Sequence, residues 1–278
     1  MADRVLGVPG VGLVDPDTPL LRVDDLGVLR GDGCFETLWV HDGVVEAFEL
    51  HLARLGHSAA ALELPAPDLS WWRALVTEMV AAWARPDEAA LRLTLTRGVE
   101  GTGVPTGFAL MSPLPDRILA QRRDGIAVIT LNRGMPADVH GDTPWLLGGV
   151  KSISYAVNMA ALRYAGQLGA DDVIFVSTDG QVTEGPTSTV VWARGDHLYT
   201  TPTTLGILDG TTVRTLFDRA AAHRFTTEVA RATVDELHAA DAVWLLSSVR
   251  GAARVNSLDG RNRGDAGLTA RVQAALGH

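Results

Sequence analysis

Lys151 is the only lysine in a chain that carries 24 Lys and Arg residues in total. Arginine serves wherever a positive charge is enough, but its guanidinium stays protonated and cannot act as an amine nucleophile. A lysine amine can form a Schiff base or move a proton once burial has lowered its pKa. On composition alone, a surface lysine left over from drift towards arginine is an equal alternative. Lys151 is therefore the first candidate for covalent chemistry, and its neighbours must decide.

The composition limits the classes of protein to which the chain can belong. Its 278 residues, 46% hydrophobic and 21% charged, have the balance of a globular protein of one large or two modest domains. A net charge of -9 argues against binding to nucleic acid, which requires a basic surface. No apolar stretch is long enough for a membrane span, and the first residues do not resemble a signal peptide. We expect a cytoplasmic protein that binds a small molecule.

Cys34 is the only cysteine of the chain, which excludes an internal disulfide. A nucleophilic thiol needs a base beside it, and the sequence offers none that can be assigned there. We therefore interpret Cys34 as a small buried apolar residue. No set of residues suggests a metal site, and none is expected.

Turn residues and hydrophobic periodicity divide the chain into two regions. Residues 1–115 are expected to form the first, an α/β domain. Proline and charge concentrate in 112–125, so residues 116–124 are expected to be a linker between domains. In the first region the sequence predicts a hairpin turning at 41–43, helices near 52–62 and 71–84, and strands at 91–96 and 107–112.

Residues 125–278 are expected to form the second and larger domain. The predicted elements are a strand at 125–131, a helix near 154–168, two strands joined by a turn at 178–180, a strand at 188–193, a helix opening at 210–212, a strand at 241–247, a turn at 257–262 and a closing helix. Glu184 lies just after the second strand of the pair.

Taken in order, several segments resemble those of the class IV, or fold-type IV, pyridoxal-phosphate aminotransferase family. The resemblance covers about residues 20–256 and is carried by GDGCFETL (31–38), HLARL (51–55), GVKSISYAVNMAALRYA (149–165), VTEGPTSTVVW (182–192) and GILDGTT (206–212). It implies an α+β enzyme with a smaller N-terminal α/β domain and a larger, β-barrel-like C-terminal α/β domain. It also implies pyridoxal 5′-phosphate (PLP) as cofactor and a homodimer.

The resemblance assigns a role to each candidate residue. Lys151 would hold PLP as a Schiff base and then move protons at the substrate carbon, and Glu184 would keep the pyridine nitrogen protonated so that the ring can act as an electron sink. A helix amino terminus and an arginine would bind the 5′-phosphate. The phosphate and cofactor candidates are Arg54, Leu208, Thr211, Thr212 and Ser248, and the substrate candidates are Phe35, Arg92 and Arg97.

Within the family, GDGCFET and LTRGVEGTGVPT (95–106) are most similar to the 4-amino-4-deoxychorismate lyases, which form 4-aminobenzoate and pyruvate on the way to folate. The alternative is an aminotransferase of branched-chain or D-amino-acid type. The R-x-H pair with which D-amino-acid aminotransferases bind a carboxylate is replaced by Thr102 and Val104, and Ser154 stands where lyases often have asparagine. A third hypothesis, a binding protein that kept the fold but lost catalysis, is disfavoured because Lys151 and Glu184 are both present.

Overall fold

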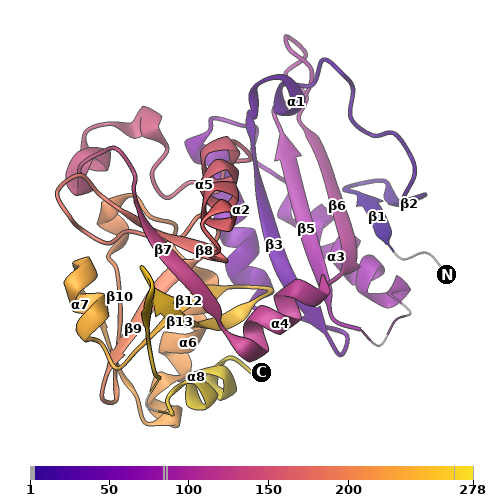
Figure 1. Cartoon of the computed structure of the whole chain (residues 1–278). Helices are drawn as coiled ribbons and strands as arrows, with labels where there is room; N and C mark the ends of the chain where they lie inside the picture. The colour runs from indigo at the N-terminus through magenta and orange to yellow at the C-terminus, as the bar shows by residue number, and fades with distance from the viewer. Residues whose placement is uncertain (1–3, 84, 86, 266, 278) are drawn as a thin grey trace. The chain divides into compact units, whose positions relative to one another are not determined.

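The computed structural model describes residues 4–277 except 84, 86 and 266, and the chain divides into two compact units. Unit 1 consists of Met1–Pro115 together with Val150–Tyr155, and unit 2 of Asp116–Gly149 together with Ala156–His278. Figure 1 gives the labels of the helices and strands. None of the helices in the described part of the chain is long and apolar enough to cross a membrane.

Unit 1 is built on an antiparallel sheet of six strands in the order β2-β1-β6-β5-β3-β4. The strands are β1 (Val5–Val8), β2 (Gly12–Val14), β3 (Gly33–His41), β4 (Val44–Val45), β5 (Ala89–Thr96) and β6 (Thr106–Pro113). The predicted hairpin is confirmed: Asp42 and Gly43 both have positive φ, as a two-residue turn between right-twisted strands requires.

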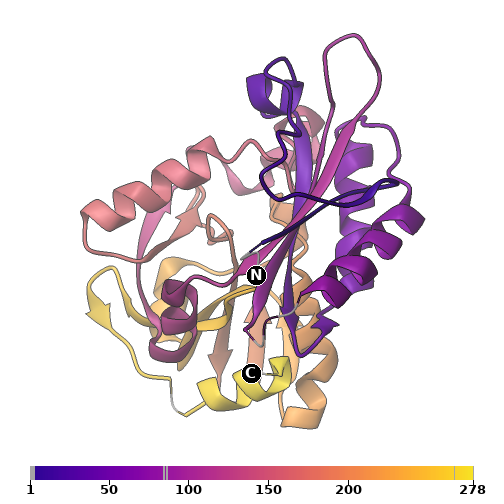
Figure 2. The same cartoon turned by 90° about the vertical axis from the view of Figure 1, so that its right-hand side faces the viewer.

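In the described part of unit 1 the helices are α1 (Leu26–Arg30), α2 (Phe48–Ala61) and α3 (Leu69–Ala82). Helices α2 and α3 cover one face of the sheet (Figure 2). Leu52, Leu55 and Ala59 of α2 are fully buried at helical spacing. The predicted helix over 71–84 exists but ends at Ala82, and its last predicted residue, 84, lies outside the described residues.

Residues 150–155 join unit 1 by pairing with β3. The N–H of Phe35 donates to the carbonyl of Lys151 at 3.1 Å, and the N–H of Ile153 donates to the carbonyl of Gly33 at 2.9 Å. Cys34 and Ser152 form the bridge between these two bonds. Lys151 is therefore held against a strand that lies more than a hundred residues earlier in the sequence.

Unit 2 contains a mixed sheet of eight strands, ordered β11-β10-β9-β12-β13-β7-β8 with β14 paired to β13. These strands are β7 (Ile126–Asn132), β8 (Asp172–Val176), β9 (Thr189–Arg194), β10 (His197–Thr200), β11 (Thr226–Val229), β12 (Ala242–Ser247), β13 (Gly251–Leu258) and β14 (Arg261–Asn262). Two buried apolar clusters pack against its strands, one of them including Trp244 and the other Trp192.

The helices of unit 2 lie between these strands along the chain. The α-helices are α4 (Asp116–Asp124), α5 (Ala156–Gln167), α6 (Thr211–Arg219), α7 (Val234–Ala239) and α8 (Thr269–Leu276). The 3-10 helices are η1 (Ala137–Gly141), η2 (Pro144–Leu146), η3 (Thr203–Leu205) and η4 (Ala220–His223).

Two segments differ from the sequence expectation. Residues 116–124 form the helix α4, which belongs to unit 2. The helix is favoured because Asp116 lies in its first turn and Arg122 and Arg123 lie in its last turn, where these charges interact favourably with the helix dipole. The expected partner strand of β8 is reduced to one bridge, between Val176 and Val182. Val182 donates its N–H to the carbonyl of Ala232, while Phe175 of β8 keeps hydrogen bonds to the backbone of Thr183 and Glu184.

Candidate active site

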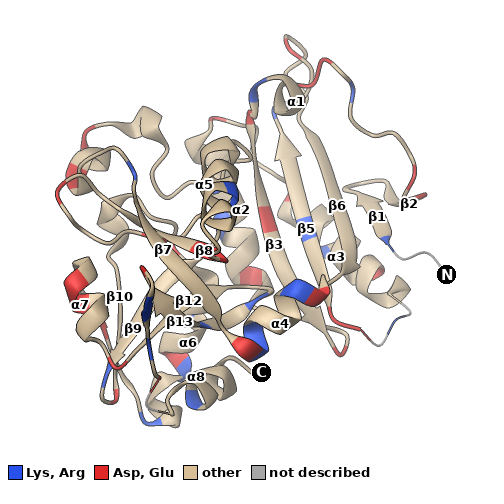
Figure 3. Cartoon of the chain, in the orientation of Figure 1, with Lys and Arg blue, Asp and Glu red and all other residues tan. Residues whose placement is uncertain are grey.

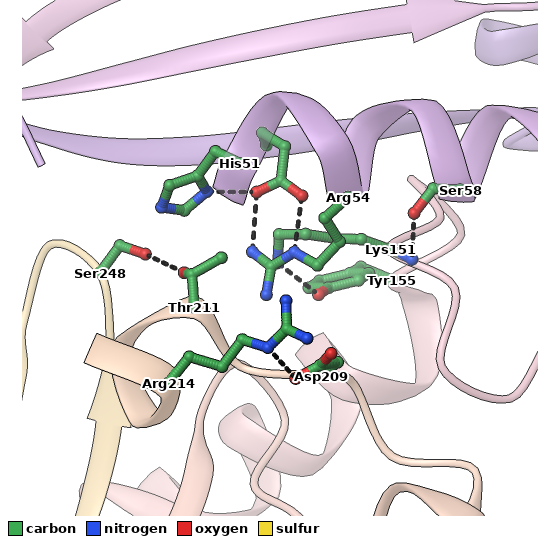
Figure 4. A network of polar contacts seen from close by, with 10 residues as sticks. His51, Arg54, Ser58, Lys151, Tyr155, Asp209, Thr211, Arg214 and Ser248 are labelled. Carbon is green, nitrogen blue, oxygen red and sulfur yellow. Dashed lines mark hydrogen bonds and ion pairs between the residues drawn. The ribbon is translucent and has the colours of Figure 1, made fainter. Parts of the chain in front are cut away.

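The backbone of Lys151 is fixed on two sides and its amine lies against aromatic rings. Besides the bond from Phe35, the backbone N–H of Lys151 donates to the hydroxyl of Ser58 on α2 at 3.1 Å. Its Nζ donates to the hydroxyl of Tyr155 at 3.3 Å (Figure 4). The same Nζ lies 4.4 Å from the centre of the Phe35 ring. The backbone of Lys151 is thus fixed by hydrogen bonds while its amine lies at the end of a flexible side chain, which suits a group that must form a covalent bond and move protons.

Arg54 is bound by a buried carboxylate. Its Nε and Nη2 each donate to an oxygen of Glu36 at 2.7 Å, and the Nδ1 of His51 donates to the same carboxylate at 2.7 Å (Figure 4). Burial alone would raise the pKa of the Glu36 carboxyl, but the hydrogen bonds from Arg54 and His51 outweigh it and lower that pKa to about 2. Burial also lowers the pKa of His51. The group therefore consists of a carboxylate, a guanidinium and a neutral histidine.

Arg92 lies on β5, opposite Thr37 of β3, and its side chain is exposed. The carbon of its guanidinium is 5.5 Å from the centre of the Phe35 ring, the ring that Lys151 also contacts. In Figure 3, β5 carries a basic segment and the neighbouring β3 an acidic one. Because side chains alternate between the faces of a strand, Phe35 and Glu36 point to opposite faces of the sheet.

Arg97 has a different environment from Arg92. It donates to both oxygens of Asp32, at 2.6 and 3.1 Å, and to the backbone carbonyls of Leu62 and Glu63, at 2.6 and 3.2 Å. These carbonyls lie just beyond the end of α2. The guanidinium of Arg97 therefore joins the end of a helix to the start of β3.

In unit 2, the Glu184 side chain is directed by the chain segment that precedes α6. One of its carboxylate oxygens accepts a hydrogen bond from the N–H of Leu208 at 3.0 Å. The backbone carbonyl of Glu184 accepts from the N–H of Phe175 on β8 at 2.8 Å, so the main chain is fixed as well. Glu184 and Leu208, both predicted from the sequence, are thus direct neighbours.

The start of α6 brings together the other predicted residues of unit 2. Thr211 is buried, and its hydroxyl lies 3.5 Å from that of Ser248 (Figure 4). Thr212 follows it in the first turn, which contains no acidic residue. Gly210 caps the helix, and a Cβ at that position would lie 2.6 Å from the Thr189 hydroxyl oxygen. First-turn amides with two hydroxyls and no carboxylate in that turn fit a phosphate group.

The predicted residues therefore form two groups, one in each unit. Unit 1 brings Lys151, Phe35 and Arg92 together around one ring, and Arg54 lies on α2 beside Glu36. Arg97 forms an ion pair with Asp32. Cys34 is buried, which together with Glu36 raises the pKa of its thiol to about 12, as suits an apolar residue.

Four residues of the unit 1 group were not predicted from the sequence: Glu36, His51, Ser58 and Tyr155. Tyr155 stands four residues after Lys151, a spacing that could have revealed it. His51, Arg54 and Ser58 recur at intervals of three and four along α2, which marks one polar face of a helix otherwise packed by leucine and alanine. Nothing in the sequence marks Glu36 as the partner of that face.

A PLP enzyme needs an amine, a carboxylate and a binding site for a phosphate, and the family comparison points to such an enzyme. The chain belongs to the class IV aminotransferases: the family model described as "Amino-transferase class IV" matches residues 33–258. Class IV aminotransferases use PLP, so PLP is the cofactor and the chain is an enzyme. The expected α+β, fold-type IV architecture is confirmed.

Relatives are found among both curated proteins and solved structures. A bifunctional aminodeoxychorismate lyase / D-amino acid transaminase from Mycobacterium tuberculosis is 48% identical over 258 residues, which cover 90% of this chain and 89% of the relative. The PLP-bound form of a hypothetical aminotransferase from Mycobacterium tuberculosis has a TM-score of 0.95 at 45% identity, covering 99% of this chain and 97% of that one. A fold IV transaminase from Curtobacterium pusillum has a TM-score of 0.94 at 44% identity, with the same coverage.

Proposed function

We propose that the chain is a PLP-dependent 4-amino-4-deoxychorismate lyase, which releases 4-aminobenzoate and pyruvate. The observation that carries the proposal is the arrangement around Phe35, where the Lys151 amine and the Arg92 guanidinium contact the same ring. The substrate has its amine and its carboxylate on opposite sides of a six-membered ring. An amine that reacts at the cofactor held by Lys151 would therefore leave the carboxylate for a cation such as the Arg92 guanidinium. The similarity to a relative named for this lyase activity supports the same substrate.

In this proposal each group of the chain has one task. Lys151 binds the cofactor, takes the proton from the ring carbon that bears nitrogen and returns a proton to the departing group, with Tyr155 orienting its amine. Glu184 keeps the pyridine nitrogen protonated, and PLP, when bound, supplies the electron sink. Arg54, the amides of Thr211 and Thr212, and the hydroxyl of Ser248 bind the phosphate.

Arg92, in preference to Arg97, is assigned to the substrate carboxylate. Arg97 already has four hydrogen bonds within unit 1. The guanidinium of Arg92 is exposed and contacts the Phe35 ring, and a guanidinium can bind a carboxylate through two parallel hydrogen bonds. The glycine-rich segment that follows does not offer a second carboxylate partner at its tip. There Thr102 bonds back to the carbonyl of Val99 and Val104 is exposed.

Transamination of D-amino acids is the second candidate function, because the relative at 48% identity is named for both activities. The two reactions differ in what they require: the lyase reaction needs no amino acceptor, whereas transamination needs a 2-oxo acid. The test is to supply purified protein with enzymatically generated aminodeoxychorismate alone, and separately with D-amino acids and 2-oxoglutarate. We expect 4-aminobenzoate and pyruvate without any acceptor, and none from Lys151→Ala. Transamination alone would refute the lyase proposal.

We also propose that the enzyme is a homodimer, as the family resemblance implies. The apolar side chains of Val157 and Tyr164 are exposed on α5, as is that of Leu168 just after it, and Trp145 is 73% exposed nearby in the sequence. Apolar exposure of this kind suits a subunit interface. Light scattering on the purified holoenzyme tests the proposal, and a mass of one chain would contradict it.

A further inference from the structure

We propose that Glu36 is a positioning residue: it holds the guanidinium of Arg54 in the orientation that binds the cofactor phosphate. The inference rests on the phosphate role of Arg54 in the proposed function and extends it to a residue that lies on the opposite face of the sheet from Phe35. It concerns the affinity for the cofactor, so it is independent of which substrate the enzyme takes.

The geometry of the pair fixes the direction of the guanidinium. Nε and Nη2 of Arg54 both donate to Glu36 at 2.7 Å, one to each carboxylate oxygen. A guanidinium is planar, so two parallel bonds on one edge determine where the opposite edge, which carries Nη1, points. With a single bond, the group could still rotate about it.

The carboxylate is itself fixed from a second direction. His51 lies three residues before Arg54, on the same face of α2, and its Nδ1 donates to Glu36 at 2.7 Å. Because the Glu36 carboxylate is ionised and can only accept, the proton of the neutral histidine is on Nδ1. Glu36 therefore accepts three short hydrogen bonds from one helix and cannot swing with Arg54.

Stability alone does not explain the pair. The Glu36 side chain is fully buried and that of Arg54 is 10% exposed. Apolar residues of similar volume stabilise a fold as well as a buried ion pair does, because the desolvation of two charges offsets their attraction. A buried pair of this geometry is better explained by the specific orientation that it imposes.

Glu36 also has an opposing effect, and the test must separate the two. Its negative charge repels a phosphate through space, so removing it would strengthen PLP binding if repulsion were its only influence. That repulsion acts whether or not Arg54 is present. The positioning effect exists only through Arg54, so a double-mutant cycle between the two residues isolates it.

The experiment measures the dissociation constants of PLP and of pyridoxal, which lacks the phosphate, for the apo forms of four proteins: native, Glu36→Gln, Arg54→Ala and the double variant. We expect Arg54→Ala to weaken PLP binding by about ten- to a hundredfold in the native background. In the Glu36→Gln background we expect the same change to matter less than about threefold, because an Arg54 without its partner no longer points at the phosphate. Pyridoxal affinity should change little in all four.

Three outcomes would overturn the inference: an Arg54 contribution that is unchanged or larger without Glu36, no effect of Arg54→Ala on PLP, or equal losses for PLP and pyridoxal. Met79→Ala, which removes a fully buried side chain from the core of the same unit, controls for loss of stability. It should lower the resistance to urea and leave the preference for PLP over pyridoxal intact. If the four proteins show the expected PLP affinities but the native protein forms no 4-aminobenzoate, the lyase proposal is refuted and the inference about Glu36 stands.

Discussion

Two arginines, Arg92 within β5 and Arg97 just after it, are expected to respond oppositely to the same substitution. Arg92→Gln should lower kcat/KM and leave the fold intact, whereas Arg97→Gln should weaken the fold and leave kcat/KM within about threefold. The reason lies in their contacts within the described part of the chain. The guanidinium of Arg92 contacts the Phe35 ring, whereas that of Arg97 donates four hydrogen bonds, to Asp32, Leu62 and Glu63.

The magnitudes follow from these contacts. A hydrogen bond between a guanidinium and a carboxylate contributes about 1.5–3 kcal/mol, so losing one from Arg92 to the substrate should lower kcat/KM by about ten- to a hundredfold. Because Arg92 is exposed, its contact with Phe35 adds at most about 0.5–1 kcal/mol to stability. Arg97 and Asp32 are 34% and 29% exposed, so solvent weakens their pair, and we expect Arg97→Gln to lower the free energy of unfolding by about 1–2 kcal/mol.

The assays are steady-state kinetics on whichever reaction the protein catalyses and urea unfolding of the same preparations. Arg92→Lys and Arg97→Lys, which retain the charge, serve as matched controls and should each recover only part of the loss, since lysine cannot form a bidentate contact. A hundredfold drop in kcat/KM for Arg97→Gln at unchanged stability, with Arg92→Gln near native, would refute the assignment of both residues.

Four further outcomes are expected. Borohydride reduction followed by peptide mapping should find a pyridoxyl group on Lys151, and a native protein that binds no PLP would exclude that role. Glu184→Gln should keep PLP, because the Leu208 N–H retains an acceptor, but should lose at least about a hundredfold in rate; near-native turnover would assign the task to another group. Ser248→Ala should weaken PLP binding less than Arg54→Ala, by about 0.5–1.5 kcal/mol, and the reverse order in a PLP titration would contradict the phosphate site. The free energy of unfolding should fall with acid. It should fall first as the pH drops below 6.5, because the fold lowers the pKa of His51, and again between pH 4.5 and about 2, because the fold lowers the pKa of Glu36. Urea unfolding of Glu36→Gln should lack the decline between pH 4.5 and about 2.

Local features of the chain were predictable where local physics decides them. The apolar spacing of Leu52, Leu55 and Ala59 predicts α2, and Asp42-Gly43 predicts the hairpin. Residues 116–124 were expected to be a linker because proline and charge concentrate in 112–125, yet a proline followed by an acidic start and a basic end also describes the helix α4. Composition alone does not separate these two structures.

The site was predictable where a residue type is rare and not where a contact is distant. A lone lysine draws attention by itself, and the motif series supplied Glu184, Leu208 and Thr211. Arg92 and Arg97 are equivalent in the sequence, because only the position of Asp32 across the sheet distinguishes them. Glu36 shares contacts with residues 15 and 18 positions away, which no periodicity marks.

The pairing of residues 150–155 with β3 has a consequence for anyone who divides or recombines this gene. The polypeptide leaves unit 1 after Pro115, returns at Val150 and leaves again after Tyr155. A fragment that stops at 115 therefore lacks the lysine, and a fragment that starts at 116 carries the lysine without the strand that holds its backbone. A chimera that exchanges unit 1 between two relatives must transplant residues 150–155 with it, since a single crossover would combine the lysine of one parent with the β3 of the other.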